Sequence, residues 1–307
     1  MKYFLVAFLL IQLLSCSKKA EPLAQAVTNP TSALSVLPRP NKEVEEKSAD
    51  DFVTKEERQN YDGYDIFKQR KSVIENETKI EVTTVLLKKN SKIVATYSGK
   101  VHPYTTTDFG LFPFLGNDLK QLIVSTTEPR GGEQWIAELS PTYRKIFNTK
   151  EWRVGREGAD LKFVDINNDG VYEIIALDVW FLIFDNLSMS ESPMVSVIFK
   201  YNPTAKKFVP ANHLFSSYAL KGIQEEVEKF STVNKDQYLG SKVYLLLKFL
   251  YAGKEKEGWE FFESSYQAKD KTKVKNTIKN ILKNSRTYQY IRAHSDSEAS
   301  PVGIRRH

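Results

Sequence analysis

The spacing of hydrophobic and polar residues changes along the chain and divides it into regions. After a first apolar run the chain is polar and proline-rich to about residue 61, and from about residue 77 short β-branched and aromatic runs alternate with turn residues. Beyond residue 212 the apolar positions recur at helical intervals. Short punctuated runs predict strands, and spacings of i, i+4 and i+7 predict amphipathic helices. The sequence therefore predicts an α+β fold, in which a small antiparallel β domain precedes a C-terminal helical domain.

The predicted β domain covers residues 77–212. It opens with a hairpin whose two runs, 80–87 and 93–97, flank the turn-forming residues Asn90 and Ser91. Gly, Pro, Asn and Asp separate the runs that follow, as expected for short antiparallel strands. These runs are 109–115, 119–126, 135–139, 145–147, 161–164, 171–178, 195–201 and 207–209.

The predicted helical domain covers residues 213–292. Its last helix shows the pattern most clearly, because Val274, Ile278 and Leu282 recur every four residues on one face. Residues 293–307 lack such a pattern and are predicted to form a disordered tail. The four predicted helices are 218–230, 240–251, 257–266 and 273–283.

The start of the chain has the pattern of a signal peptide. Lys2 precedes an apolar run of about a dozen residues, which is shorter than the roughly 20 residues that span a membrane. The run ends in Leu-Leu-Ser-Cys, which resembles the bacterial lipobox, and this resemblance implies that residues 1–15 are removed and that Cys16 becomes the acylated N-terminus. Residues 16–61 are then a disordered tether, since their polar composition cannot bury a core. The alternative is an ordinary secretory signal with an incidental cysteine.

Composition narrows the possible functions. Cys16 is the only cysteine, so an internal disulfide and a cysteine-based zinc site are excluded, and the four histidines lack the spacing of paired metal ligands. The formal net charge of +6 is small for 307 residues and does not indicate a nucleic-acid partner. The expected partner is instead a membrane, reached through the lipid anchor, and the expected location is the bacterial cell envelope, at the outer membrane or cell surface.

One short segment, residues 165–173, has the spacing of a cation-binding loop. Oxygen-bearing side chains occupy its positions 1, 3, 5 and 9, and a glycine at position 6 allows a sharp turn. Ca²⁺ takes six to eight oxygen ligands, which alternate residues of a tight loop can supply. Position 12 is Ala176 rather than the Glu that an EF-hand requires, so an EF-hand is excluded. The alternative to a calcium loop is an acidic β-turn that binds no ion. The candidate ligands of this expected structural calcium ion are Asp165, Asn167, Asp169, the Val171 carbonyl and Glu173.

The strand-like flanks of this loop make it similar to the FG-GAP or VCBS calcium loops of integrin-like β-propeller blades and of bacterial exported proteins. The resemblance implies that the side chains at 165, 167, 169 and 173 and the carbonyl at 171 bind calcium. A second copy without the ligands lies 52 residues earlier, where residues 112–124 align with 164–176 and Gln121 takes the place of Glu173. Two such units cannot close a propeller. A looser likeness to a group of uncharacterised bacterial exported proteins extends over residues 105–291.

Three functions remain open from the sequence. The leading hypothesis is a non-enzymatic, membrane-anchored lipoprotein whose calcium-stabilised β domain acts as a binding or envelope-structural module for a protein or glycan. The second is an envelope glycan hydrolase that uses paired carboxylates, with Glu128, Asp178 and Asp185 as candidates, although no nucleophile or histidine motif is present. The third is a surface adhesin, which rests on fold analogy alone.

Overall fold

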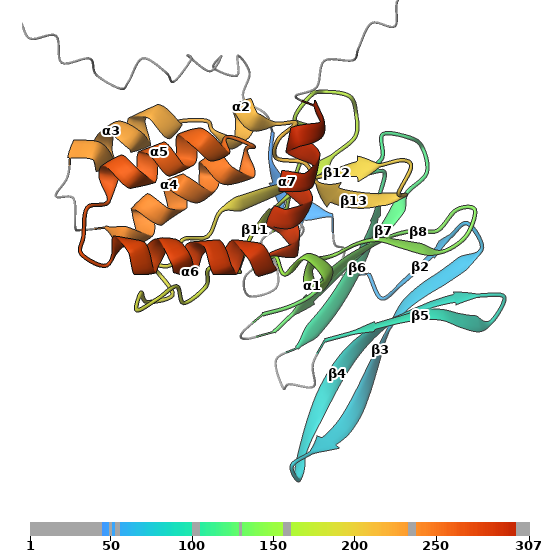
Figure 1. Cartoon of the computed structure of the whole chain (residues 1–307). Coiled ribbons are helices and arrows are strands. Elements are labelled where there is room, and N and C mark those ends of the chain that lie inside the picture. Colours follow the sequence, from blue (N-terminus) through green and yellow to red (C-terminus); the bar gives the residue numbers. More distant parts are fainter. Residues whose placement is uncertain are drawn as a thin grey trace, which may run out of the picture. The chain divides into compact units, whose positions relative to one another are not determined.

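The structure is a computed structural model that describes residues 45–48, 51–52, 56–99, 105–128, 131–155, 161–232 and 238–298. These residues form three antiparallel sheets and a C-terminal set of helices, which confirms the predicted α+β class. The predicted signal peptide, Cys16 and most of the predicted tether lie outside the described residues. Figure 1 shows the arrangement of the elements along the chain.

The N-terminal sheet is a meander in the order β2-β3-β4-β5. Each of its hairpins turns through residues with positive φ, such as Asp62 (51°) with Gly63 (74°), and Asn90 (51°) with Ser91 (63°). Such turns match the right-handed twist of the strands that they join. The hairpin of β4 and β5 was predicted, whereas β2 and β3 were not. The strands are β2 (Arg58–Tyr61), β3 (Tyr64–Glu75), β4 (Thr78–Lys89) and β5 (Lys92–Ser98).

The middle sheet, in the order β6-β7-β8-β9, is buried on both faces. Alternate side chains of β7 point to opposite faces, as in any strand. Leu122 and Val124 pack in a core with the N-terminal sheet, while Ile123 packs in the main core with the C-terminal sheet and the helices. The strands are β6 (Thr106–Phe112), β7 (Gln121–Thr127), β8 (Gln134–Glu138) and β9 (Arg144–Asn148), followed by the short helix α1 (Thr149–Trp152).

The C-terminal sheet has the order β1-β10-β11-β12-β13. Ile174 and Phe199 face the main core, while their neighbours Ile175 and Ile198 lie in a separate small core on the other face. This sheet therefore also packs on both faces. The strands are β1 (Lys47–Ser48), β10 (Lys162–Val164), β11 (Glu173–Leu177), β12 (Ser196–Asn202) and β13 (Lys207–Pro210).

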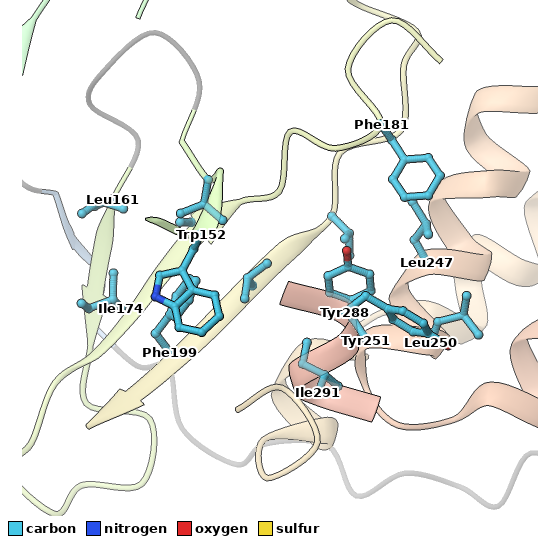
Figure 2. Packing of buried hydrophobic residues seen from close by; sticks show 14 of the residues in the cluster. Trp152, Leu161, Ile174, Phe181, Phe199, Leu247, Leu250, Tyr251, Tyr288 and Ile291 are labelled. Carbon is cyan, nitrogen blue, oxygen red and sulfur yellow. The ribbon is translucent and has the colours of Figure 1, made fainter. Parts of the chain in front are cut away.

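The helices complete the main core. The apolar run in α4 is buried, and Leu247 and Leu250 pack there with Tyr288 and Ile291 of the last helix, as Figure 2 shows. That last helix extends to residue 298, so the predicted disordered tail is wrong for residues 293–298. The helices are α2 (Ser216–Ala219), α3 (Ile223–Thr232), α4 (Leu239–Tyr251), α5 (Glu255–Ser265), α6 (Lys271–Asn284) and α7 (Arg286–Glu298).

Part of the segment predicted as a tether is structured. β1 pairs with β10, β2 begins the N-terminal sheet, and the Phe52 side chain is only 7% exposed. Phe52 packs against Phe112, Phe114 and Phe163, with ring centroids 4.2–5.1 Å away. The prediction of a disordered tether as far as residue 61 is therefore wrong for β1, Phe52 and β2. The polar composition of the segment did not show that Phe52 packs in a core formed by strands far away in the sequence.

The two segments that the 52-residue alignment matches both form strand–loop–strand units with equivalent pairing. In the first, β6 pairs with β7 so that Phe112 lies opposite Gln121, and in the second, β10 pairs with β11 so that Val164 lies opposite Glu173. These are the positions that the 52-residue alignment matches. Each unit continues into two further antiparallel strands, so the middle and C-terminal sheets are built from equivalent meanders.

Candidate metal site in the second repeat

Asp165 organises the loop that joins β10 to β11. Its Oδ1 accepts the Asp169 N–H at 3.0 Å, and its Oδ2 accepts the Gly170 N–H at 3.0 Å. The chain can turn this tightly because Asn168 and Gly170 have φ values of 57° and 82°, in the left-handed region that Gly and Asn tolerate best. The first residue of the predicted ligand set therefore shapes the loop through hydrogen bonds to its backbone.

Asp169 and Glu173 converge on one cationic group, the ammonium of Lys200 on β12. Lys200 Nζ lies 3.4 Å from Asp169 Oδ2 and 3.3 Å from Glu173 Oε1. The pairing of Ile174 with Phe199 brings Lys200 next to Glu173 across the strands. Two of the predicted ligands thus already share a positive charge, which comes from a neighbouring strand.

Burial affects these two carboxylates differently. The Glu173 side chain is fully buried, and desolvation raises its pKa above the usual value although the Ile166 N–H and Lys200 oppose this effect. The Asp169 side chain is 40% exposed. Desolvation also acts to raise its pKa, but hydrogen bonds from the Val171 N–H and Asn167 and the charge of Lys200 together lower the pKa below the usual value. Asp169 is therefore the more strongly acidic of the pair.

Not all the predicted ligands converge. Asn167 Nδ2 donates to Asp169 Oδ2 at 2.8 Å, and the Val171 N–H donates to Asp169 Oδ1 at 2.8 Å, so these residues fold the loop onto Asp169. Within the described ranges, no group of three or more His, Cys, Asp or Glu side chains is placed so that it could hold a metal ion. The calcium site consequently stays a prediction.

The donor chemistry of the loop nevertheless suits a hard cation. An ionised carboxylate has about four lone-pair positions on its two oxygens, so Asp165 and Asp169 can accept backbone N–H groups and still bind an ion. Asp169 and Glu173 each direct an oxygen to the Lys200 ammonium, which stands in for a cation between them. A calcium ion at this point would have to take the place of the Lys200 ammonium, whose side chain is 30% exposed.

The loop also contacts the equivalent loop of the first repeat. The Tyr172 N–H donates to the Phe114 carbonyl at 2.9 Å, and the Tyr172 ring lies 5.3 Å from that of Phe112. Gly116 lies so close to Gly170 that a Cβ on Gly116 would be 2.8 Å from the Gly170 carbonyl oxygen. A structural change in residues 165–173, the acidic loop, would therefore directly alter the contacts of the first repeat.

The first repeat closes its own loop without acidic ligands. Gln121 Oε1 accepts the Leu115 N–H at 3.3 Å, much as Glu173 Oε2 accepts the Ile166 N–H at 3.0 Å in the second repeat. Gln121 is 2% exposed and also donates to the Leu119 carbonyl. A buried side-chain acceptor at the start of the second strand is thus common to both units, whether or not it carries charge.

The three carboxylates considered for hydrolysis have different surroundings. Asp178 is 1% exposed and accepts the Tyr251 hydroxyl at 2.6 Å and the Trp180 N–H at 2.7 Å. Asp185 pairs with Lys273 of α6 at 3.3 Å. Glu128 lines a separate cavity beside Glu133, which itself pairs with Lys150 at 3.1 Å. Asp178 and Asp185 therefore each contact a side chain of the helical region.

Lys200 is the site residue that the sequence analysis missed. The run 195–201 was predicted as a strand, but its pairing partner was not, so the lysine could not be placed beside Glu173. The available signal was a lone basic residue in an otherwise apolar strand, which in a sheet buried on both faces needs an acidic partner.

No helix in the described part of the chain is long and apolar enough to cross a membrane. Comparisons with known protein families, with curated proteins and with solved structures found no match for this chain. Functional inference therefore rests on the residues and their geometry.

Proposed function

We propose that this chain is a lipoprotein of the bacterial cell envelope, held on a membrane by acylated Cys16, whose β repeats act as a binding or structural module. The signal-like residues 1–15, the lipobox-like ending and the polar stretch that follows support the anchor. Acyl chains contribute about 0.8 kcal/mol per buried CH₂ to membrane binding, so two or more chains hold a protein stably.

The second part of the proposal is that residues 165–173 bind Ca²⁺, which stiffens the junction between the repeats. The observation that carries it is the convergence of Asp169 and Glu173 on a single cation, the Lys200 ammonium. Asp165, Asn167, Asp169 and Glu173 would hold the ion with their side chains, and Val171 with its carbonyl. Calcium would supply a divalent charge that binds the loop to β11 more firmly than one ammonium group does.

Thermal unfolding with and without calcium tests this part. Sites in extracellular modules have dissociation constants of about 10⁻⁴–10⁻³ M, so 10 mM Ca²⁺ should stabilise the fold by about 1–3 kcal/mol relative to EGTA. The melting temperature should rise by about 2–6 °C for a chain of this size. The same melting temperature in Ca²⁺ and EGTA would remove the calcium site from the proposal.

Two variants make the test specific. Asp169→Asn should abolish the calcium effect, whereas Asp118→Asn, which changes an exposed carboxylate in the equivalent loop of the first repeat, should leave it intact. Lys200→Gln removes the competing ammonium and should increase the calcium effect, while costing about 1 kcal/mol in EGTA because a charged contact is lost. A weaker calcium effect in Lys200→Gln would show that the lysine assists the ion rather than competing with it.

The anchor has its own experiment. Growth of the producing cells with radiolabelled palmitate should label the wild-type chain and leave Cys16→Ser unlabelled. Fractionation should find the wild-type chain with membranes and the variant away from them. Equal labelling of both chains, or membrane association of the variant, would exclude Cys16 as the point of attachment.

A further inference from the structure

A cavity of about 490 Å³ lies between the C-terminal sheet and the helices α2 and α4. It is on the face of the sheet that holds Ile175 and Ile198, opposite the main core. Cavities of about 300–1,000 Å³ with apolar walls and a few converging polar groups are the usual places for small-molecule binding. No residue of the acidic loop, residues 165–173, lines it.

The floor of the cavity is formed by the C-terminal sheet, is largely apolar, and is fixed by strand pairing. Lys162 pairs with Ile175 and Ile175 with Ile198, so these three residues form a row across β10, β11 and β12. Leu177 and Ser196 form the next pair on the same face, and both line the cavity. Because strands of a sheet hold their side chains in fixed register, the floor is a preformed surface.

The charged lining of the cavity is mainly basic. Lys162 from β10, Lys221 from the segment after α2, and Lys248 from α4 all line it, together with one carboxylate, Glu46, and the aromatic rings of Tyr218 and Tyr244. The Tyr218 hydroxyl donates to Glu46 at 2.8 Å, and Lys162 Nζ lies 2.7 Å from Glu46. These lining groups thus already hold one carboxylate, that of Glu46, and its pKa is lowered, first of all by the hydrogen bond from Lys162.

The remaining charges of the lining favour a second anion. Lys162 is neutralised by Glu46, and Lys248 by Glu226, from which it lies 3.3 Å away. Among the described residues, Lys221 makes no side-chain hydrogen bond or ion pair, and its charge acts on Glu46 from a distance. One positive charge therefore remains uncompensated beside the apolar floor. A ligand with one negative group and an apolar body would complement both features.

We propose that this cavity binds an aliphatic monocarboxylate, with its chain on Ile175 and Ile198 and its carboxylate beside Lys221 and Lys248. Chain burial would supply about 0.8 kcal/mol per CH₂, and the ammonium groups would select an anionic head. The proposal gives the binding module a chemical class of ligand. It does not depend on calcium binding or on acylation of Cys16.

Calorimetric titration of the full chain in phosphatidylcholine vesicles tests the proposal, with protein-free vesicles as the blank. Octanoate should bind saturably at one site per chain. Octyltrimethylammonium, which has the same chain and a cationic head, should bind at least about tenfold more weakly, as expected when a charge-assisted contact is lost. Propionate should also bind more weakly, because it lacks most of the chain.

Variants locate the site. Lys221→Glu should weaken octanoate binding by about tenfold or more, and Ser196→Phe, which fills the cavity from its exposed edge, should abolish it. Lys256→Glu makes the same charge change on α5, on a side chain that is 84% exposed and away from the cavity, and should leave binding unchanged. Unfolding midpoints show that each variant is folded, and Lys221 is exposed enough to be replaced without harm to the core.

Several outcomes would overturn the proposal. These are the absence of saturable octanoate binding, equal binding of the cationic amphiphile, and equal losses in Lys221→Glu and Lys256→Glu. The last result would indicate that octanoate is attracted by the net positive charge of the protein rather than bound in the cavity. Calcium or EGTA should leave octanoate binding unchanged, so the outcome here and that of the calcium experiment can be told apart.

Discussion

The loops of the two repeats share the same strand pairing, but different side chains hold them in place. Both follow a strand whose last residue lies opposite a buried Gln121 or Glu173, and in both that side chain accepts a loop N–H. The first loop is held by a fully buried Phe114, whereas the second is held by Asp165, which accepts two backbone N–H groups. The difference teaches that this strand–loop–strand shape requires the register and one acceptor, and that aromatic packing can replace the acidic side chains.

The loops are also unequal in what they contact. Phe114 lies in the main core and packs on Phe52 and Phe163, so the first loop is stabilised by burial. The second loop is more exposed, and its hydrogen bonds are largely internal. The net contribution of one hydrogen bond to the free energy of unfolding is smaller than that of burying a large aromatic side chain. The first loop should therefore be the more stable of the two.

The largest expected effect comes from truncating the aromatic side chain of the first loop. Phe114→Ala should lower the free energy of unfolding by about 3–5 kcal/mol, because it leaves a cavity in the main core. Ile166→Ala, at the aligned position of the second loop, changes a half-buried side chain and should cost about 1 kcal/mol. Urea unfolding of both variants measures the difference. Equal losses would mean that the two loops are held in the same way.

The next largest effect is a pH dependence of stability caused by Asp178. This residue follows the second strand of the second repeat, and Thr126 takes the aligned position in the first repeat. Desolvation raises the pKa of Asp178 to about 6, against the hydrogen bonds from Tyr251 and Trp180. An unfolded Asp has a pKa of about 3.9, so the folded chain binds a proton between about pH 4 and pH 6 that the unfolded chain does not. The free energy of unfolding should therefore fall as the pH rises through this window, by up to about 3 kcal/mol.

Asp178→Asn should remove this part of the pH dependence, because its amide oxygen still accepts a hydrogen bond but does not ionise. Urea unfolding of both chains between pH 4 and pH 7 gives the difference curve. Thr126→Val, at the aligned uncharged position, should leave the shape of the pH curve unchanged. A difference curve for Asp178→Asn that stays flat would show that the Asp178 carboxylate is not the source.

The smallest effect concerns the contact between the two loops. Gly116 has a φ of 67°, and a Cβ there would lie 2.8 Å from the Gly170 carbonyl oxygen, so Gly116→Ala should cost about 1–3 kcal/mol. Gly170 has a φ of 82°, but its nearest contact would be an ordinary 3.9 Å, so Gly170→Ala should cost about 1 kcal/mol. Thermal unfolding of both variants ranks them. The reverse order would mean that the loops separate in solution.

Local patterns in the sequence predicted the α+β class, and they aligned two segments that both form strand–loop–strand units. The alignment of Gln121 with Glu173 succeeded because both residues start a strand at the same register. The α4 helix was predicted because its dense apolar run has no other way to be buried. These features depend on neighbours within a few residues, which sequence patterns record.

Features that depend on distant partners were missed. β3 carries many charged residues and shows no clear alternation, yet Tyr64 and Ile66 are buried because the middle sheet covers them. Phe52 lies in a polar stretch and is buried only because strands more than 50 residues away surround it. The same holds for Lys200, which reaches the acidic loop from β12, and for the cavity, since tertiary packing alone brings their residues together.

The segment that contains β1 and Phe52 determines which strand would bear a force applied to the N-terminal end of the chain. Glu46 bonds to Lys162, Lys47 pairs with Phe163, and Phe52 packs on Phe163, so three successive attachments end on β10. β10 runs directly into the acidic loop. In the proposed lipoprotein, tension on the N-terminal end would therefore pass along this path, and the stiffness of the loop would determine how far β10 moves under load.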